Sequence, residues 1–473
     1  MHLRRIFAPD KKGVVLSLNR KQFQKRVYLF ATSLLILAIE TGIMLYVWYW
    51  HYNTGIPKAF YFWGHVFIAV VYLVMLFFSS VMYGGLKIGS FRMIELTLSQ
   101  GFATLVTNIL FYAIICLLAY RFPTVIPLLI GMIVQCFAIG AWIIAATMGY
   151  RALFPPIDVL LVYGGNNQDI IIEKFKTRRH QFTVTKSMSV SEDTKEIFDE
   201  IGKHEAVMLW DIPDELRNTV FKSCYEKDVD IYVSPKIMDI VLKGSQNLHL
   251  FDTALLYTKS DPIEAEQRTI KRLFDVVFAL LMIIITSPIM LITAAAVKIC
   301  DGGSVFYRQT RCTRGMREFR IIKFRSMIEH AEEDGKAVLA SRHDNRITPV
   351  GHVIRKLRID ELPQLFNVLA GDMSFVGPRP ERPEKIMEYT QEMPEFSYRT
   401  KVVAGITGYA QVYGKYNTRP YDKLKLDLYY IENFSIWLDL RLLILTVKTL
   451  FMIGSSEGIA DDGGKPSTGE KNE

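Results

Sequence analysis

The sequence predicts a membrane protein with three parts: a four-helix transmembrane region, a Rossmann-like α/β domain, and a mixed, mainly helical C-terminal domain with a re-entrant membrane helix-break-helix. Three observations predict this fold class. Four apolar runs near the start each approach or exceed the ~20 residues that a helix needs to cross a bilayer. In the middle, strand-like runs alternate with helix-like runs, which is typical of βαβ units. A fifth apolar run, interrupted by Ser287-Pro288, opens a polar and basic C-terminal part.

The average composition excludes several classes of protein. Of the 473 residues, 50% are hydrophobic and 22% are charged, which excludes a disordered chain, a collagen-like chain and a disulfide scaffold. The five cysteines are scattered without a CxxC pair, which argues against a zinc site and an oxidising compartment. The net charge of +8 suits nucleic acid, anionic lipid or a phosphorylated substrate. Because no recognisable nucleic-acid module accompanies that charge, we expect no nucleic acid partner.

Residues 27–150 are predicted to form four transmembrane helices. Their apolar runs are Val27–Trp50, Phe60–Tyr83, Gly101–Tyr120 and Thr124–Thr147. The segment before them, residues 1–26, is basic, the loop between the second and third runs carries Lys87 and Arg92, and Arg151 follows the fourth. The positive-inside rule therefore places the N-terminus, and everything after Arg151, in the cytoplasm.

Three polar side chains lie inside these runs: Glu40, His65 and Asn108. An ionisable residue inside a membrane is a candidate for function, because its burial there is costly. The alternative is structural, and we favour it. In that case Glu40 stays protonated or pairs with His65 or Asn108, and the pair fixes the packing of the helices.

Residues 157–255 are predicted to form the Rossmann-like α/β domain. Its strand-like runs are Asp158–Tyr163, Gln181–Thr185, Ala206–Trp210 and Val229–Val233. Helices are expected to begin near Ser191 and Pro213, and this alternation predicts a parallel sheet. The first strand-to-helix turn reads Gly-Gly-Asn-Asn (residues 164–167) and lacks the GxGxxG pattern of dinucleotide sites. Nucleotide binding and a role in regulation or assembly therefore remain alternatives for this domain, and a homo-oligomer is compatible with the second.

The fifth apolar run, residues 273–300, is expected to enter and leave the membrane on one face. Pro288 lies near its middle, where proline removes a backbone donor and breaks or kinks a helix. A full span would place one of the two basic flanks, Arg272 or Lys298, on the wrong side. A kinked span is the alternative. In the re-entrant case the freed backbone at the break needs a partner inside the membrane, and Ser287 is the candidate.

The C-terminal part contains an acidic pair among basic residues. Asp360 and Glu361 are adjacent, with Arg355 and Arg358 before them and Arg379 after them. Arginine forks suit phosphate oxygens, and an acidic pair beside them is what magnesium-dependent phosphoryl transfer needs. A carboxylate can also act as the nucleophile. The structural alternative is that Asp360 caps a helix that begins at Glu361.

Several long motifs in this part resemble one family. They are KFRSM (residues 323–327), RIDELPQLFNVLAGDMSFVGPRP (residues 358–380) and GITGYAQV (residues 405–412). Together with the Ser-Pro-interrupted run, they make residues 268–458 similar to the catalytic domain of the bacterial sugar transferases that act on polyprenyl phosphate. These enzymes are also called monotopic phosphoglycosyl transferases. The whole chain resembles the large form of that family.

The resemblance implies a reaction. Such an enzyme transfers a sugar-1-phosphate from a nucleotide diphosphate sugar, here expected to be a UDP-sugar, to undecaprenyl phosphate and releases the nucleoside monophosphate. The family's aspartate nucleophile falls on Asp360, and its glutamate, which helps to hold Mg²⁺ together with the aspartate, falls on Glu361. A covalent phosphosugar-aspartate intermediate is therefore expected.

The resemblance also assigns the basic residues of the site. The family's catalytic lysine falls on Lys323, and its phosphate-binding arginines fall on Arg355 and Arg379, with Arg325 beside them in the KFR motif. For Lys323 and Arg325 the alternative is a basic face on anionic lipid.

The chain departs from the family pattern at a few loop positions. The family usually has proline where Ala404 stands, valine-glycine where Cys312-Thr313 stand, and often arginine in place of Lys415. None of these changes removes a residue of the acidic pair.

The resemblance also predicts a cellular context. It implies the bacterial inner membrane, with the catalytic domain on the cytoplasmic side, and the first membrane step of exopolysaccharide, capsule or O-antigen synthesis. The alternative is a catalytically inert membrane scaffold or regulator of polysaccharide assembly. Residues 461–473 are polar and predicted to be disordered.

Overall fold

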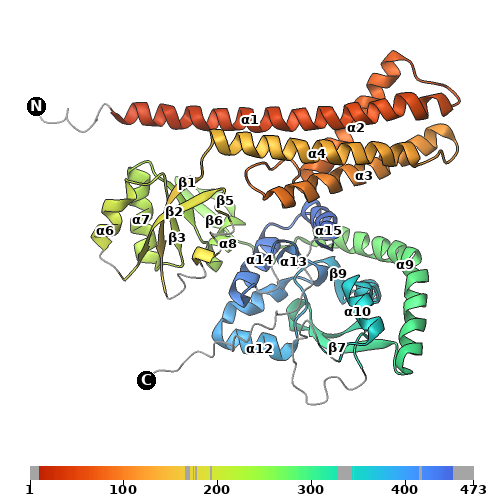
Figure 1. Ribbon diagram of the computed structural model, residues 1–473. Coiled ribbons are helices and arrows are strands. Elements are labelled where there is room, and N and C mark those ends of the chain that lie inside the picture. Colours follow the sequence, from red (N-terminus) through yellow and green to blue (C-terminus); the bar gives the residue numbers. More distant parts are fainter. Residues whose placement is uncertain are drawn as a thin grey trace, which may run out of the picture. The chain divides into compact units, whose positions relative to one another are not determined.

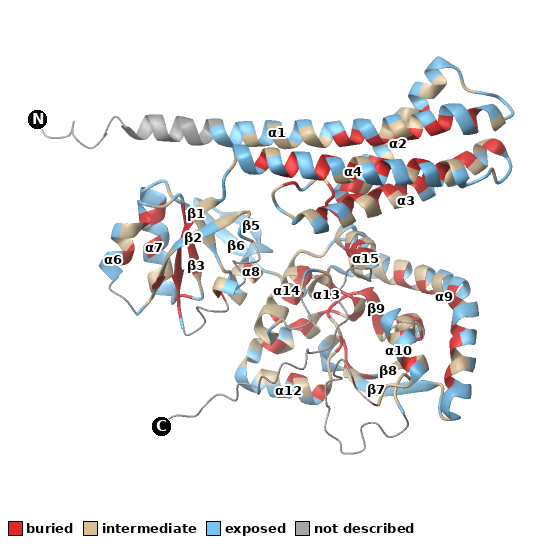
Figure 2. Cartoon of the chain, in the orientation of Figure 1, coloured by how far each residue is buried: buried red, intermediate tan, exposed pale blue. Residues whose placement is uncertain are grey.

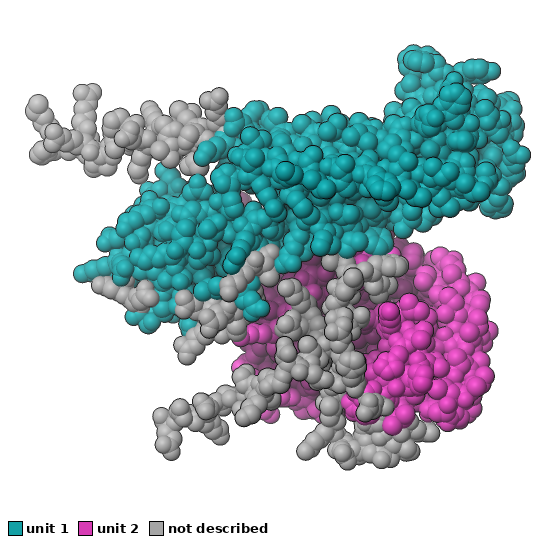
Figure 3. All heavy atoms as spheres, viewed as in Figure 1, with its two compact units in different colours: residues 1–234 teal, residues 235–473 magenta. Residues whose placement is uncertain are grey.

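The computed structural model describes residues 10–165, 171–173, 175, 178–191, 194–328, 344, 346–414 and 418–450, with side chains described from residue 21 to residue 449. The chain divides into two compact units, residues 1–234 and residues 235–473 (Figure 3). The predicted tail, residues 461–473, lies outside the described residues, as does the start of the basic N-terminal segment. Helix α1 already begins at Asp10, so most of that segment is helical.

The first unit opens with a helical bundle (Figure 1). Its helices are α1 (Asp10–Val47), α2 (Phe62–Tyr83), α3 (Met93–Ala119) and α4 (Ile126–Leu153), and a π turn (Trp48–Tyr52) and a 3-10 turn (Asn53–Gly55) follow α1. Among the described residues, five helices are long and apolar enough to cross a membrane: these four and α9 of the second unit. Large apolar side chains of the bundle, such as Phe67, Phe78 and Phe137, are exposed. Figure 2 shows many exposed positions along the bundle helices in pale blue. An apolar exterior of this kind suits lipid rather than water.

Buried polar side chains connect all four helices of the bundle. Glu40 accepts hydrogen bonds from Gln100 Nε2 (2.7 Å) and Thr104 Oγ1 (2.5 Å). Gln135 Nε2 donates to the main-chain oxygen of Glu40 (3.1 Å) and to Tyr72 Oη (2.8 Å). The side-chain partners of Glu40 are therefore Gln100 and Thr104 of α3. The predicted pairing with His65 or Asn108 is wrong. The polar network fixes the packing of the bundle, because each of these groups needs a partner away from water.

The rest of the first unit is an α/β domain, as predicted. Four parallel strands of the described chain, in the order β2-β1-β3-β4, form its sheet. They are β1 (Ile157–Tyr163), β2 (Phe182–Ser189), β3 (Ala206–Trp210) and β4 (Asp230–Val233), with helices α6 (Thr194–Ile201) and α7 (Asp214–Glu226). The central strands β1 and β3 are buried (red in Figure 2), which explains their continuous apolar sequences.

The first turn of the sheet is tight. Gly164 follows β1, and a Cβ there would lie 2.2 Å from the main-chain oxygen of Asp211, which follows β3. Only glycine fits, because the two loops touch where the strand order reverses. Asn166 and Asn167 of the predicted turn lie outside the described residues.

The second unit begins with a helix and a hairpin, most of which lie in the range predicted for the α/β domain, residues 157–255. They are α8 (Ile237–Lys243), β5 (Gln246–Leu250) and β6 (Thr253–Tyr257). Helix α8 packs on α14 (Pro420–Glu432), and Ile240 is buried in the same core as Ile263 and Leu428. The division between the units therefore falls before α8, at Ser234.

Helix α9 (Ala265–Asp301) is one helix that turns sharply along its length (Figure 1). Instead of the predicted helix-break-helix, the helix continues through Pro288. The carbonyl that an N–H at position 288 would reach in a regular helix belongs to Ile284, and Ser287 Oγ donates to it instead (2.9 Å). This replacement explains why the helix continues.

Both halves of α9 rest on the same unit. In the first half, Arg272 Nη1 donates to Val368 O (2.6 Å), and Asp275 Oδ1 accepts from Phe375 N (3.1 Å). In the second half, Met290 and Val297 pack in one cluster with Phe324 and Ile354. Large apolar side chains of α9 face outward over much of its length, including Leu273, Leu281, Ile285, Leu291 and Ile299. The helix is therefore an apolar arm that is attached to one domain at both ends.

The remaining elements build a compact α/β core. In chain order they are β7 (Phe306–Cys312), η3 (Arg314–Met316), β8 (Glu318–Phe324), α10 (Pro349–Lys356), η4 (Ile359–Glu361), α11 (Gln364–Ala370), β9 (Met373–Val376), α12 (Pro383–Glu392), η5 (Pro394–Lys401), β10 (Ala404–Thr407), α13 (Tyr409–Tyr413), α14 and α15 (Ile436–Leu450). Strands β7 and β8 are antiparallel, whereas β9 and β10 are parallel. The loops that follow β9 and β10 meet, because Gly377 N donates to Thr407 O (2.8 Å).

Candidate active site

The acidic pair lies on a short 3-10 turn between two helices. The N-cap of helix α10 is Thr348, whose hydroxyl accepts a hydrogen bond from Gly351 N (2.9 Å), and its C-cap is Leu357. Arg358 follows in the left-handed region (φ 57°), which is unusual for a residue with a side chain. This conformation reverses the chain and begins η4, which carries Asp360 and Glu361.

Asp360 is not a helix cap. The next helix, α11, begins at Gln364 with Pro363 at its N-cap position and no capping side chain. Asp360 Oδ1 is buried and has no hydrogen-bond partner among the described residues. The carboxylate is thus held in the site without being used for local structure, which contradicts the capping alternative.

One oxygen of Glu361 gathers three cations from different elements. Glu361 Oε1 lies 3.1 Å from Lys323 Nζ of β8, 3.0 Å from Arg379 Nη2 of the loop after β9, and 3.6 Å from Arg358 Nη1. Burial by itself raises the pKa of Glu361, but Arg379, Lys323 and Arg358 outweigh it and hold that pKa well below its usual range. Glu361 is therefore ionised.

Asp360 has the opposite shift. Burial raises its pKa, the charge on Glu361 raises it further, and Lys323, Arg358 and Arg355 oppose only part of this rise. Burial also lowers the pKa of Lys323, although the neighbouring Glu361 opposes that change. Two adjacent carboxylates thus differ in proton affinity, a pattern typical of sites in which the two have different chemical roles.

The predicted basic residues do not all reach the pair directly. Lys323 and Arg379 contact Glu361, and Arg355, in the last turn of α10, acts on Asp360 through its charge. Arg325 forms its ion pair with Asp301 at the end of α9. The site therefore contains Lys323, Arg379 and Arg355 near the acidic pair. Arg325 instead pairs with α9, the apolar arm.

Arg358 is a residue of the site that was not predicted from the sequence. Its guanidinium faces Glu361, and its own backbone conformation sets the turn that carries the pair. The available signal was its position directly before Ile359-Asp360-Glu361, within the basic setting already noted.

The donor atoms fit a magnesium ion. Among the described residues there is no cluster of three or more His, Cys, Asp or Glu side chains that could enclose a metal. Magnesium does not need one, because it usually binds one or two carboxylates together with substrate phosphates and water. The adjacent carboxylates, with Asp360 Oδ1 buried and without a hydrogen bond, supply that kind of donor set.

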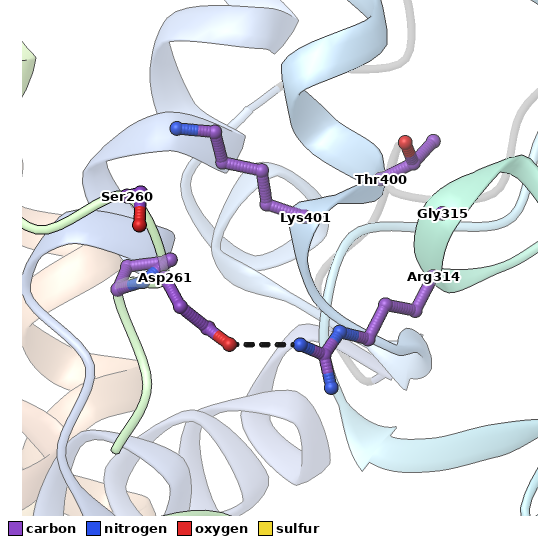
Figure 4. Close-up of a pocket in the computed structure, with 7 residues that line it drawn as sticks. Ser260, Asp261, Arg314, Gly315, Thr400 and Lys401 are labelled. Atoms are coloured by element: carbon purple, nitrogen blue, oxygen red, sulfur yellow. Dashed lines mark hydrogen bonds and ion pairs between the residues drawn. The ribbon is translucent and has the colours of Figure 1, made fainter. Parts of the chain in front are cut away.

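A cavity of about 310 Å³ elsewhere in the second unit contains none of these residues. Its lining is Ser260, Asp261, Pro262, Arg314, Gly315, Thr400 and Lys401. Figure 4 shows Asp261 and Arg314 pointing toward each other across it, and Arg314 Nη2 lies 2.9 Å from Asp261 Oδ2. The acidic pair and its basic residues therefore lie outside this cavity.

The family model that this chain matches lies within the second unit. The family model of the bacterial sugar transferases matches residues 266–453. The UDP-N-acetylgalactosamine-undecaprenyl-phosphate N-acetylgalactosaminephosphotransferase of Aeromonas hydrophila is 42% identical over 230 residues, which are 48% of this chain and 53% of the relative. The UDP-glucose:undecaprenyl-phosphate glucose-1-phosphate transferase of Klebsiella pneumoniae is 33% identical over 303 residues, 63% of this chain and 60% of the relative.

The matched part of the chain thus spans between half and two-thirds of the length of these two relatives. A shorter relative is covered almost completely. The uncharacterized sugar transferase EpsL of Bacillus subtilis is 42% identical over 190 residues, which are 40% of this chain and 90% of that protein. The family model, this coverage and the acidic pair with its basic residues lead to one conclusion: the chain belongs to the bacterial sugar transferase family.

Proposed function

We propose that the protein transfers a sugar-1-phosphate from a UDP-sugar to undecaprenyl phosphate and releases UMP. One observation carries the proposal: a buried carboxylate oxygen of Asp360, which has no hydrogen bond to any described residue, lies beside Glu361, whose charge is already matched by Lys323 and Arg379. The two named relatives act on undecaprenyl phosphate with different sugars, N-acetylgalactosamine in one and glucose in the other. The proposal therefore concerns the reaction class.

In the first step, a carboxylate oxygen of Asp360 attacks the phosphorus that carries the sugar. A bond forms between Asp360 and that phosphorus, and the bond from the phosphorus to the oxygen of the nucleoside monophosphate breaks. UMP leaves with the electron pair of that bond. The product on the protein is a phosphosugar ester of Asp360.

In the second step, a phosphate oxygen of undecaprenyl phosphate attacks the same phosphorus. The bond between the phosphorus and Asp360 breaks, and the carboxylate is regenerated. A covalent intermediate allows a water-soluble donor and a lipid acceptor to use the site in turn, which predicts ping-pong kinetics.

The basic residues stabilise the negative charge of both steps. Lys323, Arg358 and Arg379 converge on Glu361 Oε1, so their charges surround the position next to the nucleophile. The two phosphates are anionic, and these cations reduce their repulsion from Asp360. A magnesium ion held by Asp360 and Glu361 would supply further charge stabilisation at the diphosphate.

We further propose that the helices of the first unit span the bacterial inner membrane and that α9 re-enters it from the cytoplasmic face. The support is that both halves of α9 pack on one domain, at Val368 and Phe375 for the first half and at Phe324 and Ile354 for the second. A straight span would separate its two ends by the thickness of the bilayer. In this arrangement the protein would act at the first membrane step of exopolysaccharide, capsule or O-antigen synthesis.

The reaction is tested on membranes with a panel of UDP-sugars, scored by UMP release. A sugar-labelled donor should leave label on the wild-type protein when the acceptor is absent. Asp360→Asn should abolish both transfer and labelling while membrane insertion is retained. Labelling that survives in Asp360→Asn would exclude Asp360 as the nucleophile, and the absence of UMP release with every sugar would favour an inert scaffold.

The topology is tested separately with an engineered cysteine near residue 465. A membrane-impermeant thiol reagent should label it only after the cells are opened, because re-entry returns the chain to the cytoplasm. Labelling from outside intact cells would contradict re-entry and favour a full span. A cysteine placed in the loop between α1 and α2 is the positive control for outside labelling.

A further inference from the structure

The loop that carries Arg379, residues 378–381, has all of its main-chain carbonyls occupied. The donors, in the order of the carbonyls that they reach, are Gly405 N (2.9 Å), Arg399 Nη2 (3.0 Å), Arg311 Nη1 (3.3 Å) and Cys312 N (3.0 Å). Pro378 and Pro380 have no N–H and fixed φ angles, which further restrict this loop. The loop is therefore held from several elements at once.

Arg399 is the most deeply buried side chain among these donors. It lies on η5 with 2% of its side chain exposed, and its Nη2 donates to the main-chain oxygen of Arg379. The same Nη2 lies 2.8 Å from Asp427 Oδ2 of α14, and Nη1 lies 3.5 Å from Glu381 Oε1. The ring of Phe396 lies 5.0 Å from the guanidinium carbon. The bond to the Arg379 oxygen has hydrogen-bond geometry, whereas Asp427 and Glu381 contribute ion pairs, because Arg399 Nη1 and Asp427 Oδ2 have no hydrogen-bond partner among the described residues.

The carboxylates that hold Arg399 are themselves part of a larger ionic cluster. Glu381 also pairs with Lys423 and lies 3.8 Å from Arg311 Nη1. Asp427 is 1% exposed. Buried ion pairs of this kind contribute little net stability, because desolvation cancels much of the attraction. Net stability therefore does not explain these ion pairs, whereas the orientation that they give to Arg399 does. The residue that this orientation affects most directly is Arg379, because Arg399 donates to its main-chain oxygen.

We infer that Arg399 is a positioning residue for Arg379, and that Asp427 and Glu381 orient Arg399. The chain of contacts is short: Asp427 and Glu381 hold the guanidinium of Arg399, Arg399 holds the carbonyl of Arg379, and Arg379 Nη2 lies 3.0 Å from Glu361. In the part of the chain that the structure describes, Arg399 forms no hydrogen bond or ion pair with Asp360 or Glu361. The effect of Arg399 on the reaction rate rests on the proposed function, whereas its effect on the Arg379 loop does not.

Arg399→Lys is the informative substitution. It keeps a positive charge between Glu381 and Asp427, so the carboxylates are not left unpaired, but one ammonium cannot replace a planar fork that reaches a carbonyl and two carboxylates. Arg268→Lys is the matched control. Arg268 Nη2 also binds both a carboxylate (Asp261 Oδ2, 2.5 Å) and a main-chain oxygen (Ile263 O, 3.0 Å), but it does not touch the Arg379 loop.

The first measurement does not depend on catalysis. Hydrogen–deuterium exchange is followed by mass spectrometry in the full-length protein, on peptides that contain the amides of residues 377–382. Arg399→Lys should accelerate exchange there by about tenfold, because the loop loses a bond that opposes local opening, and should leave β8 unchanged. Arg268→Lys should change neither region. Unchanged exchange in the loop of Arg399→Lys would overturn the inference.

The second measurement is a double-mutant cycle on kcat/KM for the UDP-sugar. Misplacing a substrate-positioning group by ~1 Å costs up to about 100-fold, so Arg399→Lys should lower kcat/KM by roughly 10- to 100-fold. In an Arg379→Ala background the same substitution should cost less than about threefold, because it acts through Arg379. Arg268→Lys should leave the rate unchanged in both backgrounds.

These outcomes distinguish a failure of the positioning role of Arg399 from a failure of the proposed function. Additive losses in the cycle would overturn the positioning role and indicate general damage to the fold. A wild-type protein that releases no UMP with any UDP-sugar would contradict the proposed function, and the exchange experiment would still decide whether Arg399 holds the loop.

Discussion

Adjacent residues on one turn can have very different chemistry when their contacts differ. Glu361 shares one oxygen with three cations, whereas Asp360 Oδ1 has no hydrogen bond among the described residues. The first arrangement stabilises the charged form of its carboxylate, and the second leaves a charge without a local partner. In the proposed reaction, the nucleophile is the carboxylate that the surrounding structure does not use.

The opposite pKa shifts predict a bell-shaped pH profile. The pKa of Asp360 is raised, so activity should fall as pH drops through a value above that of an ordinary aspartate. The pKa of Lys323 is lowered, so activity should fall again as pH rises through a value below that of an ordinary lysine. In Lys323→Arg the alkaline limb should disappear, because arginine stays charged. An alkaline limb unchanged in Lys323→Arg would contradict this assignment.

Two departures from the family pattern contact each other. Ala404 stands where the family usually has proline, and Thr313 stands where it usually has glycine. Ala404 N donates to Thr313 Oγ1 (3.2 Å), and that hydroxyl donates in turn to Asp372 O (2.8 Å). Proline has no N–H to give and glycine has no hydroxyl to receive it, so the two departures complement each other.

This pairing predicts non-additive effects on stability. Ala404→Pro alone should cost about 1 kcal/mol, because it removes one buried hydrogen bond, and Thr313→Gly alone should cost about 2 kcal/mol, because it also removes the bond to Asp372. The double variant should be more stable than the sum of the two losses by about 1 kcal/mol. Thermal unfolding of the detergent-solubilised proteins measures this difference. Strictly additive losses would show that the two positions are independent.

At the scale of the elements, the sequence was most informative where one property dominates. Apolar length located the bundle helices, and the continuous apolar runs at residues 159–162 and 206–209 located the buried strands β1 and β3. The acidic pair was visible because its residues are neighbours in sequence. Arg399 was not, because Arg379 lies 20 positions and Asp427 28 positions away from it, and no local pattern indicates that such residues meet.

The bundle network gives a prediction for Glu40. Glu40→Leu removes the acceptor of two hydrogen bonds from α3 and should destabilise the bundle by about 1 kcal/mol, since such bonds average ~0.6 and reach ~1.7 kcal/mol in membrane proteins. Glu40→Gln keeps one carbonyl oxygen and should lose less. Unfolding in mixed micelles measures the loss, and UMP release should stay unchanged. A lost activity at unchanged stability would contradict the structural role.

At the scale of the whole molecule, the division into units is not where the family match begins. The match starts at residue 266, but the second unit starts at residue 235. The intervening α8 contributes Ile240 to the core, and Lys243 lies over the ring of Tyr429 at 5.3 Å. A short helix and a hairpin have the same local sequence pattern in either domain. The sequence pattern alone therefore could not show that residues 237–257 belong to the second unit.

This division predicts which fragment is stable. A fragment of residues 235–458 should unfold at a higher temperature than one of residues 268–458, because the shorter fragment lacks Ile240 and Ile263. At ~1.5–3 kcal/mol for each fully buried isoleucine, the loss is roughly 3 kcal/mol or more. Equal unfolding temperatures in the same detergent would show that α8 does not belong to the core. Activity of the longer fragment alone would show that the reaction does not need the first unit.

The attachment of both halves of α9 to one domain has a consequence for the kind of membrane that this unit tolerates. A helix that crosses a bilayer must match its thickness, and a mismatch costs fractions of a kcal/mol per ångström. In the proposed re-entrant arrangement, a bent arm fixed at Val368 on one side and at Phe324 on the other has no such length to match. The height of Asp360 above the lipid is then set by the protein's own bend, and thick and thin bilayers would present the acceptor phosphate to it at the same level.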